Sequence, residues 1–159
     1  MKFVLDADGI IKLAKAGVLV MLTTIARCML SVPVYEEVLK GKEKLYEDAF
    51  IIEELVKTGK IKLIPIRIIE QRLDFGRGET SALAGFKKYG ADAIISDDRK
   101  FLTLLDEQGV PFLRPSDVIV LLLKRKRLLR EDANSALVKL KPFIREEDYY
   151  EVKNQIGGK

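Results

Sequence analysis

The chain has 159 residues, of which 48% are hydrophobic and 33% are charged, and this length suits one domain with a buried core better than two ordinary ones. It contains no histidine and a single cysteine, which excludes Ser-His-Asp and Cys-His catalytic sites, imidazole-ligated zinc and thiolate clusters. Any bound metal must therefore be held by oxygen atoms, the ligands that Mg²⁺ and Mn²⁺ prefer.

The net charge of +4 comes entirely from the carboxyl-terminal part of the chain. Residues 1–113 carry 17 basic and 17 acidic side chains, whereas residues 114–159 carry 11 and 7. Residues 124–130 (KRKRLLR) are either the solvated end of a helix or a patch that meets a polyphosphate backbone. In the second interpretation, Lys124, Arg125 and Arg127 bind a substrate that has such a backbone.

The amino terminus meets charge too early for a secretory signal, and the apolar runs are too short to cross a bilayer. Cys28 lies in an apolar run and has no partner within the chain for a disulfide, which is typical of a reducing compartment. A cytoplasmic protein with no membrane contact is expected.

A strand is predicted over residues 2–5, and Asp6 stands at its carboxyl end. Gly9 interrupts the strand, and a helical pattern follows for which Asp8 is a suitable cap. An unpaired carboxylate at the end of an apolar strand is costly. Because Asp6 has no structural role comparable to that of Asp8, a functional role for Asp6 is favoured.

A second helix over residues 19–26 and a buried strand over residues 28–32 lead to a helix that Pro33 opens. Glu36 and Glu37 are neighbours on this helix and point about 100° apart, so only one of them faces the sheet edge. Glu37 lies on the apolar side and is the predicted site residue. Glu36 is expected to form an exposed pair with Lys40.

A helical stripe from Leu45 to Val56 precedes an edge strand over residues 60–65, and residues 67–75 form a connector of no assigned role. Residues 76–81 (GRGETS) open the next helix without matching a phosphate-binding loop. Glu79, in its first turn, either complements the helix dipole or belongs to an acidic site. The second interpretation is favoured because the other acidic positions also end strands or begin helices.

Residues 93–95 predict a buried strand that delivers adjacent aspartates to a strand-to-helix turn, the edge where ligands bind in open α/β sheets. Asp97 as a helix cap would explain one aspartate. The charge of the other aspartate must then be neutralised by a cation, by Arg99 or by water. Ser96 either holds a carboxylate or water by hydrogen bonding or satisfies the backbone.

A last strand over residues 109–113 is followed by helices over residues 116–126, 131–140 and 146–156. Residues 1–159 are expected to form a single domain, with an α/β core over residues 1–115 and a helical extension over residues 116–159.

The order of the acidic residues along the chain, from Asp6 through Glu37 and Glu79 to Asp97 and Asp98, resembles that of the PIN-domain family of metal-dependent nucleases. The matching motifs are residues 4–8 (VLDAD), 32–38 (VPVYEEV), 78–79 (GE) and 95–99 (ISDDR). Residues 118–150 are similar to the helical end of a prokaryotic subgroup close to the VapC-type toxins. The resemblance implies a three-layer α/β domain with a central, mostly parallel sheet flanked by helices.

The resemblance also implies a carboxylate cluster that binds Mg²⁺ or Mn²⁺ and activates water for phosphodiester hydrolysis. Asp8 stands where many relatives have Ser, Thr or Asn, so it either favours a second metal or caps the helix. The implied catalytic residues are Asp6, Glu37, Glu79 and Asp98, which also bind the metal with Asp97, and the supporting residues are Asp8, Ser96 and Arg99.

The leading interpretation is a metal-dependent endoribonuclease acting on RNA, either as the toxin of a pair with a small antitoxin or as a stand-alone processing enzyme. The resemblance implies a homodimer. One alternative is a non-catalytic nucleic-acid-binding module of the same fold. Another is a phospho-acceptor signalling domain, which is disfavoured because Glu37 and Glu79 would be surplus.

Overall fold

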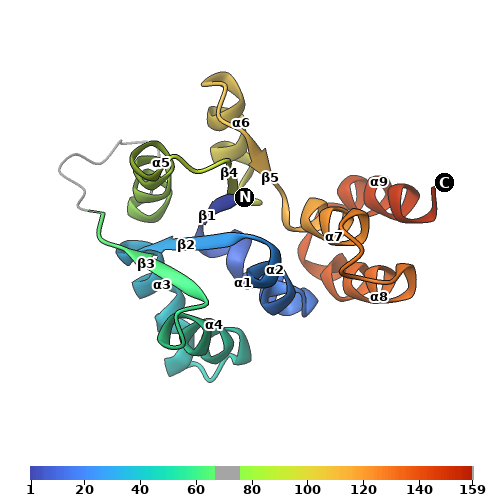
Figure 1. Cartoon of the computed structure of the whole chain (residues 1–159), viewed down its shortest axis with the longest axis horizontal. Coiled ribbons are helices and arrows are strands. Elements are labelled where there is room, and N and C mark those ends of the chain that lie inside the picture. The colour runs from blue at the N-terminus through green and yellow to red at the C-terminus, as the bar shows by residue number, and fades with distance from the viewer. Residues whose placement is uncertain (67–75, 159) are drawn as a thin grey trace.

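The computed structural model describes residues 1–66 and 76–158. Within these residues the strands form one parallel five-stranded sheet of order β3-β2-β1-β4-β5 (Figure 1). The predicted α/β class with a parallel sheet is confirmed. The strands are β1 (Lys2–Leu5), β2 (Arg27–Ser31), β3 (Ile61–Ile64), β4 (Ala93–Ile95) and β5 (Phe112–Leu113).

Helices connect the strands, because a parallel pair of strands needs a long crossover connection. The connector predicted over residues 67–75 lies outside the described residues. The helices are α1 (Ala7–Ala16), α2 (Leu19–Ile25), α3 (Val32–Glu43), α4 (Glu47–Lys57), α5 (Arg77–Tyr89), α6 (Arg99–Glu107), α7 (Pro115–Lys124), α8 (Arg130–Leu140) and α9 (Glu146–Gly157), with a short 3-10 helix η1 (Lys141–Phe143) between the last two.

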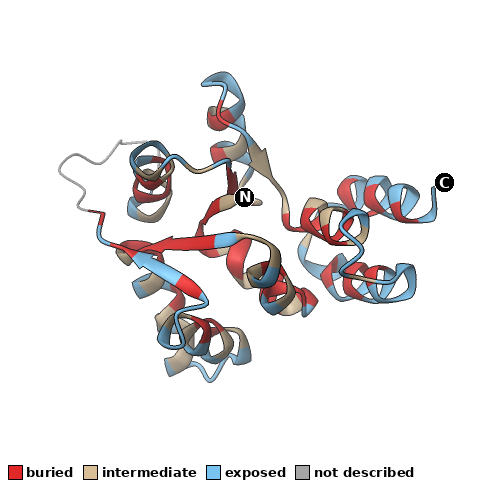
Figure 2. Ribbon diagram, in the orientation of Figure 1, coloured by how far each residue is buried: buried red, intermediate tan, exposed pale blue. Residues whose placement is uncertain are grey.

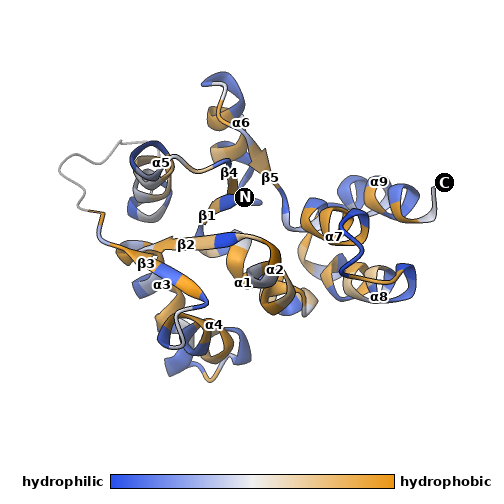
Figure 3. Cartoon of the chain, in the orientation of Figure 1, coloured by the Kyte–Doolittle hydropathy of each residue, from blue (hydrophilic) through white to orange (hydrophobic). Residues whose placement is uncertain are grey.

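The side chains of each strand alternate between two cores, one on each face of the sheet. In β1, Phe3 and Leu5 join the core beneath α1 to α4 and α7 to α9, whereas Val4 joins the core beneath α5 and α6. Buried residues accordingly line the facing surfaces of sheet and helices (Figure 2), and these surfaces are the hydrophobic ones (Figure 3). The result is three layers, α5 and α6 on one side and the other helices opposite.

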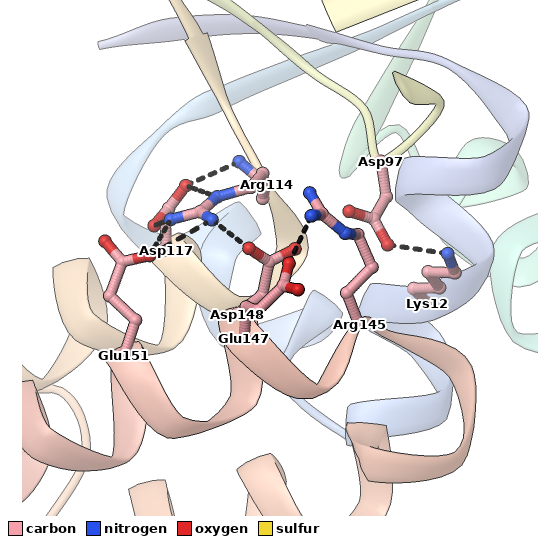
Figure 4. A network of polar contacts seen from close by, with 8 residues as sticks. All are labelled: Lys12, Asp97, Arg114, Asp117, Arg145, Glu147, Asp148 and Glu151. Carbon is pink, nitrogen blue, oxygen red and sulfur yellow. Dashed lines mark hydrogen bonds and ion pairs between the residues drawn. The ribbon is translucent and has the colours of Figure 1, made fainter. Parts of the chain in front are cut away.

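The carboxyl-terminal helices are fixed to the sheet by Arg114, which follows β5 (Figure 4). Its Nε and Nη2 atoms donate to the two oxygens of Asp117 at 2.9 and 2.8 Å, and Nη1 donates to Asp148 Oδ1 at 2.5 Å. A planar guanidinium suits such a two-oxygen contact. Arg114 therefore joins the first turn of α7 to the first turn of α9.

The order of the strands creates a switch point between β1 and β4. The chain moves outward from β1 through β2 to β3, then returns to the other side of β1 as β4. Leu5 is paired with Ile95, so Asp6 and Ser96 follow directly at the same sheet edge. In open α/β sheets this crevice is where ligands bind.

Two expectations about the helices α4 and α1 are wrong. Leu45 does not belong to the apolar stripe of α4, because it is 80% exposed in a left-handed turn (φ 58°) before that helix begins. The cap of α1 is Asp6 and not Asp8, since the helix starts at Ala7 and continues through Gly9.

Cys28 is buried, and burial raises the pKa of its thiol to about 12. Among the described helices, none combines the length and the apolar character that crossing a bilayer requires.

Candidate functional site

A cavity of about 340 Å³ at the carboxyl edge of the sheet gathers the acidic residues singled out in the sequence. They come from the turns after β1 and β4, from the first turns of α1 and α5, and from the second turn of α3. All five predicted metal ligands line it, together with two of the three supporting residues. The charged lining residues are Asp6, Asp8, Glu37, Glu79, Asp97, Asp98 and Arg99.

Asp6 is the most deeply buried of these carboxylates, with 3% of the residue exposed. Its Oδ1 accepts a hydrogen bond from Gly9 N at 2.7 Å, and the hydroxyl of Ser96 donates to its Oδ2. Burial raises its pKa to about 7; the two hydrogen bonds oppose this rise, and the charges of Asp8 and Glu79 add to it. Asp6 therefore has the structural role, as the cap of α1, that was not expected of it.

Gly9 allows this arrangement by its lack of a side chain. A Cβ atom at Gly9 would lie 2.4 Å from the carbonyl oxygen of Ile95, far inside contact distance. The first turn of α1 therefore passes directly over the end of β4, and Asp6 comes within reach of Ser96. Gly9 had been interpreted only as the residue that interrupts the strand.

Ser96 performs both functions considered for it. While its hydroxyl donates to Asp6, its oxygen accepts a hydrogen bond from Asp98 N at 3.2 Å. Asp98 in turn caps α6 by accepting from Phe101 N at 2.9 Å. The helix cap is therefore Asp98 and not Asp97, and both aspartates still line the cavity.

The orientation of the two glutamates on α3 agrees with the prediction. Glu37 lines the cavity, whereas Glu36 points to an ion pair with Arg77 at 3.5 Å and not to the expected Lys40. Glu37 Oε2 lies only 3.0 Å from the point where Gly78 would carry a Cβ atom. The glycine leaves room for this carboxylate beside the first turn of α5.

Glu79 is a cap residue and a cavity residue at once. Its Oε2 accepts from Gly76 N at 2.7 Å, which closes the first turn of α5. Burial raises its pKa, against the opposing hydrogen bond from Gly76, and the charges of Asp98, Glu37 and Asp8 raise it further. Burial is therefore the main cause of the raised pKa, and repulsion between the carboxylates of the cavity adds to it.

Lys12 is a site residue that the sequence analysis missed (Figure 4). Figure 4 shows its ammonium beside Asp97, 2.6 Å from Oδ2. Asp8 Oδ2 lies 3.2 Å from the same ammonium. Desolvation lowers its pKa, but these two carboxylates outweigh it and the pKa is raised overall. The spacing of Asp8 and Lys12, four residues apart on a helix, would have indicated one contact. Asp97 is 85 positions away from Lys12 in the sequence, so no local pattern indicates the second contact.

The predicted substrate-binding residues Lys124, Arg125 and Arg127 are exposed but lie away from this cavity. Helix α7 starts at the carboxyl edge after β5, and its far end reaches the amino edge of the sheet. There Arg125 Nη2 contacts Met1 Sδ at 3.7 Å, just before β1 begins. The structure therefore separates the basic run from the acidic site by the length of β1.

The donor set suits a hard divalent cation, because it consists of carboxylate oxygens that share one cavity. In the described part of the chain, however, no three potential ligands converge closely enough to hold a metal ion. The fit to Mg²⁺ or Mn²⁺ therefore rests on the chemistry of the donors and on the raised pKa values, which a cation would relieve.

A comparison with protein-family models finds a match over residues 2–155, and the matching family is DUF3368, a PIN domain. Among curated proteins, none matches the chain. PIN domains are generally nucleases that act on nucleic acids, and they typically use divalent metal ions.

Proposed function

Since the chain belongs to the PIN-domain family, we propose that it is an endoribonuclease that hydrolyses RNA phosphodiester bonds with Mg²⁺ or Mn²⁺. The observation that carries this proposal is the single cavity in which six carboxylates from separate parts of the chain meet. This concentration of negative charge does not stabilise the fold, because like charges that lie close together repel one another and raise the free energy of the folded protein.

Asp6, Glu37, Glu79 and Asp98 would hold the metal. A divalent cation at such a cluster lowers the pKa of a water molecule and stabilises the negative charge that develops on a phosphodiester. The chain itself holds three of these carboxylates in place: Ser96 and Gly9 orient Asp6, Gly76 N fixes Glu79, and Phe101 N fixes Asp98. Groups positioned before the substrate binds need little reorganisation during the reaction.

Arg99 would bind the substrate phosphate. It is exposed, lines the same cavity and follows Asp98 directly. Its planar guanidinium matches two phosphate oxygens at once. No histidine is present, so proton transfer falls to the carboxylates and to water.

A non-catalytic RNA-binding module is the second candidate. The observation that favours it is that the described ligands do not converge into a metal-binding group. Both candidates predict RNA binding, and only the first predicts cleavage that requires a metal.

The toxin–antitoxin interpretation remains an inference from the family resemblance, as does the homodimer. A small DNA-binding protein encoded beside this gene, copurifying with the chain when both are expressed, would support it. If the chain remains monomeric and copurifies with no such protein, the interpretation as a stand-alone enzyme would be favoured.

The decisive experiment titrates Mn²⁺ against an RNA of mixed sequence, with parallel samples in chelator. Cleavage is expected to rise with Mn²⁺ and to vanish in chelator and in Asp6→Asn. Asp106→Asn, an exposed aspartate of α6 outside the cavity, is the matched control and should behave as the wild type. RNA binding without cleavage at any metal concentration would overturn the proposal in favour of the binding module.

A further inference from the structure

The six carboxylates of the cavity fall into two groups according to their counter-ions. Asp8 and Asp97 share the ammonium of Lys12, at 3.2 and 2.6 Å. The side chains of Lys12 and Asp97 are only 15% and 8% exposed, so this pair is shielded from water. An ion pair with so little solvent around it is held firmly, since opening it leaves charges without partners.

The second group has hydrogen bonds but no ion pair. Asp6, Glu79 and Asp98 accept from backbone N–H groups, and Asp6 also accepts from Ser96. Within residues 1–66 and 76–158, none of the ion pairs involves these three residues or Glu37. The uncompensated negative charge of the cavity is therefore concentrated on this group.

We propose that the ammonium of Lys12 takes the place of a second divalent cation, so that the protein binds a single metal ion through Asp6, Glu37, Glu79 and Asp98. This inference rests on the proposed function, since it concerns the metal of that same site. The position between Asp8 and Asp97 already holds a positive charge that is covalently attached to α1. A second ion would have to displace it and expel Lys12 from a half-buried position.

This arrangement gives Asp8 a role in the cavity. Asp8 neither caps α1, which Asp6 does, nor serves a second metal. It accepts the ammonium of Lys12 one helical turn later and directs it toward Asp97. Lys12 is thus a positioning residue, because it orients Asp97 and limits the number of metal ions without touching the substrate.

The test counts bound Mn²⁺ per chain by equilibrium dialysis, with the thermal midpoint as a second readout. The wild type is expected to bind one ion, and Lys12→Arg, which keeps the positive charge, should also bind one. Lys12→Met should bind two, because Asp8 and Asp97 are then left without a cation. Lys15→Met is the matched control on the same helix, since Lys15 pairs with Asp48 away from the cavity at 2.8 Å, and it should bind one.

The thermal midpoint distinguishes the new site from a damaged fold. In chelator, Lys12→Met should unfold at a lower temperature than the wild type, because Asp97 has lost its partner. Saturating Mn²⁺ should raise its midpoint by more than it raises that of the wild type. Asp8→Ser, which leaves the buried Lys12–Asp97 pair intact, provides a folded variant in any case and should retain one ion.

The outcomes separate the two proposals. A wild type that binds two ions, a Lys12→Met that binds one, or an Asp8→Ser that binds none would each overturn the role of Lys12 while leaving a metal-dependent enzyme. A wild type that binds no Mn²⁺ at all would instead overturn the proposed function.

Discussion

The hydroxyl oxygens of Ser31 and Ser81 lie 2.6 Å apart, although 50 positions separate the two residues in the sequence. Both side chains are completely buried. Ser31 caps α3, which carries Glu37, and Ser81 lies in α5, two residues after Glu79. This contact therefore ties together the two helices that bring their glutamates to the cavity.

The direction of this hydrogen bond follows from the neighbouring contacts. The single hydroxyl proton of Ser81 is donated to the carbonyl oxygen of Gly78 at 2.7 Å. Ser31 must then be the donor between the two serines, while its oxygen accepts from Val34 N at 3.3 Å. The result is a continuous chain of hydrogen bonds from Val34 N to Gly78 O.

Ser31→Ala should destabilise the protein by about 1–2 kcal/mol, because it removes a helix cap and a buried hydrogen bond together. It should also weaken Mn²⁺ binding, since α3 and α5 lose a contact that aligns Glu37 with Glu79. Urea unfolding and metal titration measure the two effects. Thr103→Ala, which removes an exposed hydroxyl bonded within α6, is the control. Equal behaviour of the two variants would show that the serine pair does not organise the site.

The pKa of Asp6 predicts how the stability of the metal-free protein depends on pH. In the folded protein this pKa is raised from 3.8 to about 7. Between about pH 4 and pH 7 the folded chain keeps a proton that the unfolded chain has lost, so stability should fall as pH rises through this range and then level off. Glu79 and Asp97 are shifted in the same direction and add to the fall.

Asp6→Asn should reduce this fall, because asparagine keeps an oxygen to accept from Gly9 N and carries no charge. The stability of the variant in chelator should therefore depend less on pH between pH 5 and pH 8 than that of the wild type, although its amide nitrogen cannot accept from Ser96. The stabilisation by Mn²⁺ should be lost. Urea unfolding at pH 5, 6, 7 and 8 measures both slopes. If the stability of Asp6→Asn depended on pH as steeply as that of the wild type, a group other than Asp6 would be responsible for the pH dependence.

Glu36 and Glu37 should respond differently to the same substitution. Glu37→Gln is expected to abolish cleavage, since it removes a charge from the cavity. Glu36→Gln removes only an exposed pair with Arg77 and should change stability by no more than about 0.5 kcal/mol, with activity retained. Cleavage assays on the two purified variants test this. The reverse result would mean that α3 turns its other face to the site.

Replacing Lys124, Arg125 and Arg127 by Gln should weaken RNA binding without changing turnover at saturating RNA. These residues lie at the amino edge of the sheet, away from the carboxylates. The same edge carries Lys2 and Arg27, which line two adjoining hollows. On single-stranded RNA each lost phosphate contact should reduce the salt dependence of log affinity by about 0.7.

Filter binding at several salt concentrations measures this slope, and Gln substitutions of the exposed Lys40, Lys44 and Lys57 on the α3–α4 side are the control. Unchanged affinity and slope in the triple variant would remove the RNA role. An acidic protein partner would then be the better interpretation of this surface.

The sequence by itself determined the fold class and which carboxylates share the cavity. The apolar runs and helical stripes are local patterns, and acidic residues that end parallel strands or begin the following helices must meet at one edge of the sheet. Asp6, Glu37, Glu79, Asp97 and Asp98 were therefore found without coordinates. Glu37 was separated from Glu36 by helical phase alone.

Only the tertiary structure decided which groups neutralise or orient these carboxylates. The contacts of Lys12 with Asp97, Ser96 with Asp6 and Ser31 with Ser81 join residues 85, 90 and 50 positions apart. Such pairs depend on β4 lying beside β1 and on α5 packing against α3, which no local pattern encodes. The basic run likewise lies at the amino edge because α7 runs antiparallel to the strands. Charge and hydrogen bonding act between neighbours in space, and spatial neighbours are fixed by the order of the strands.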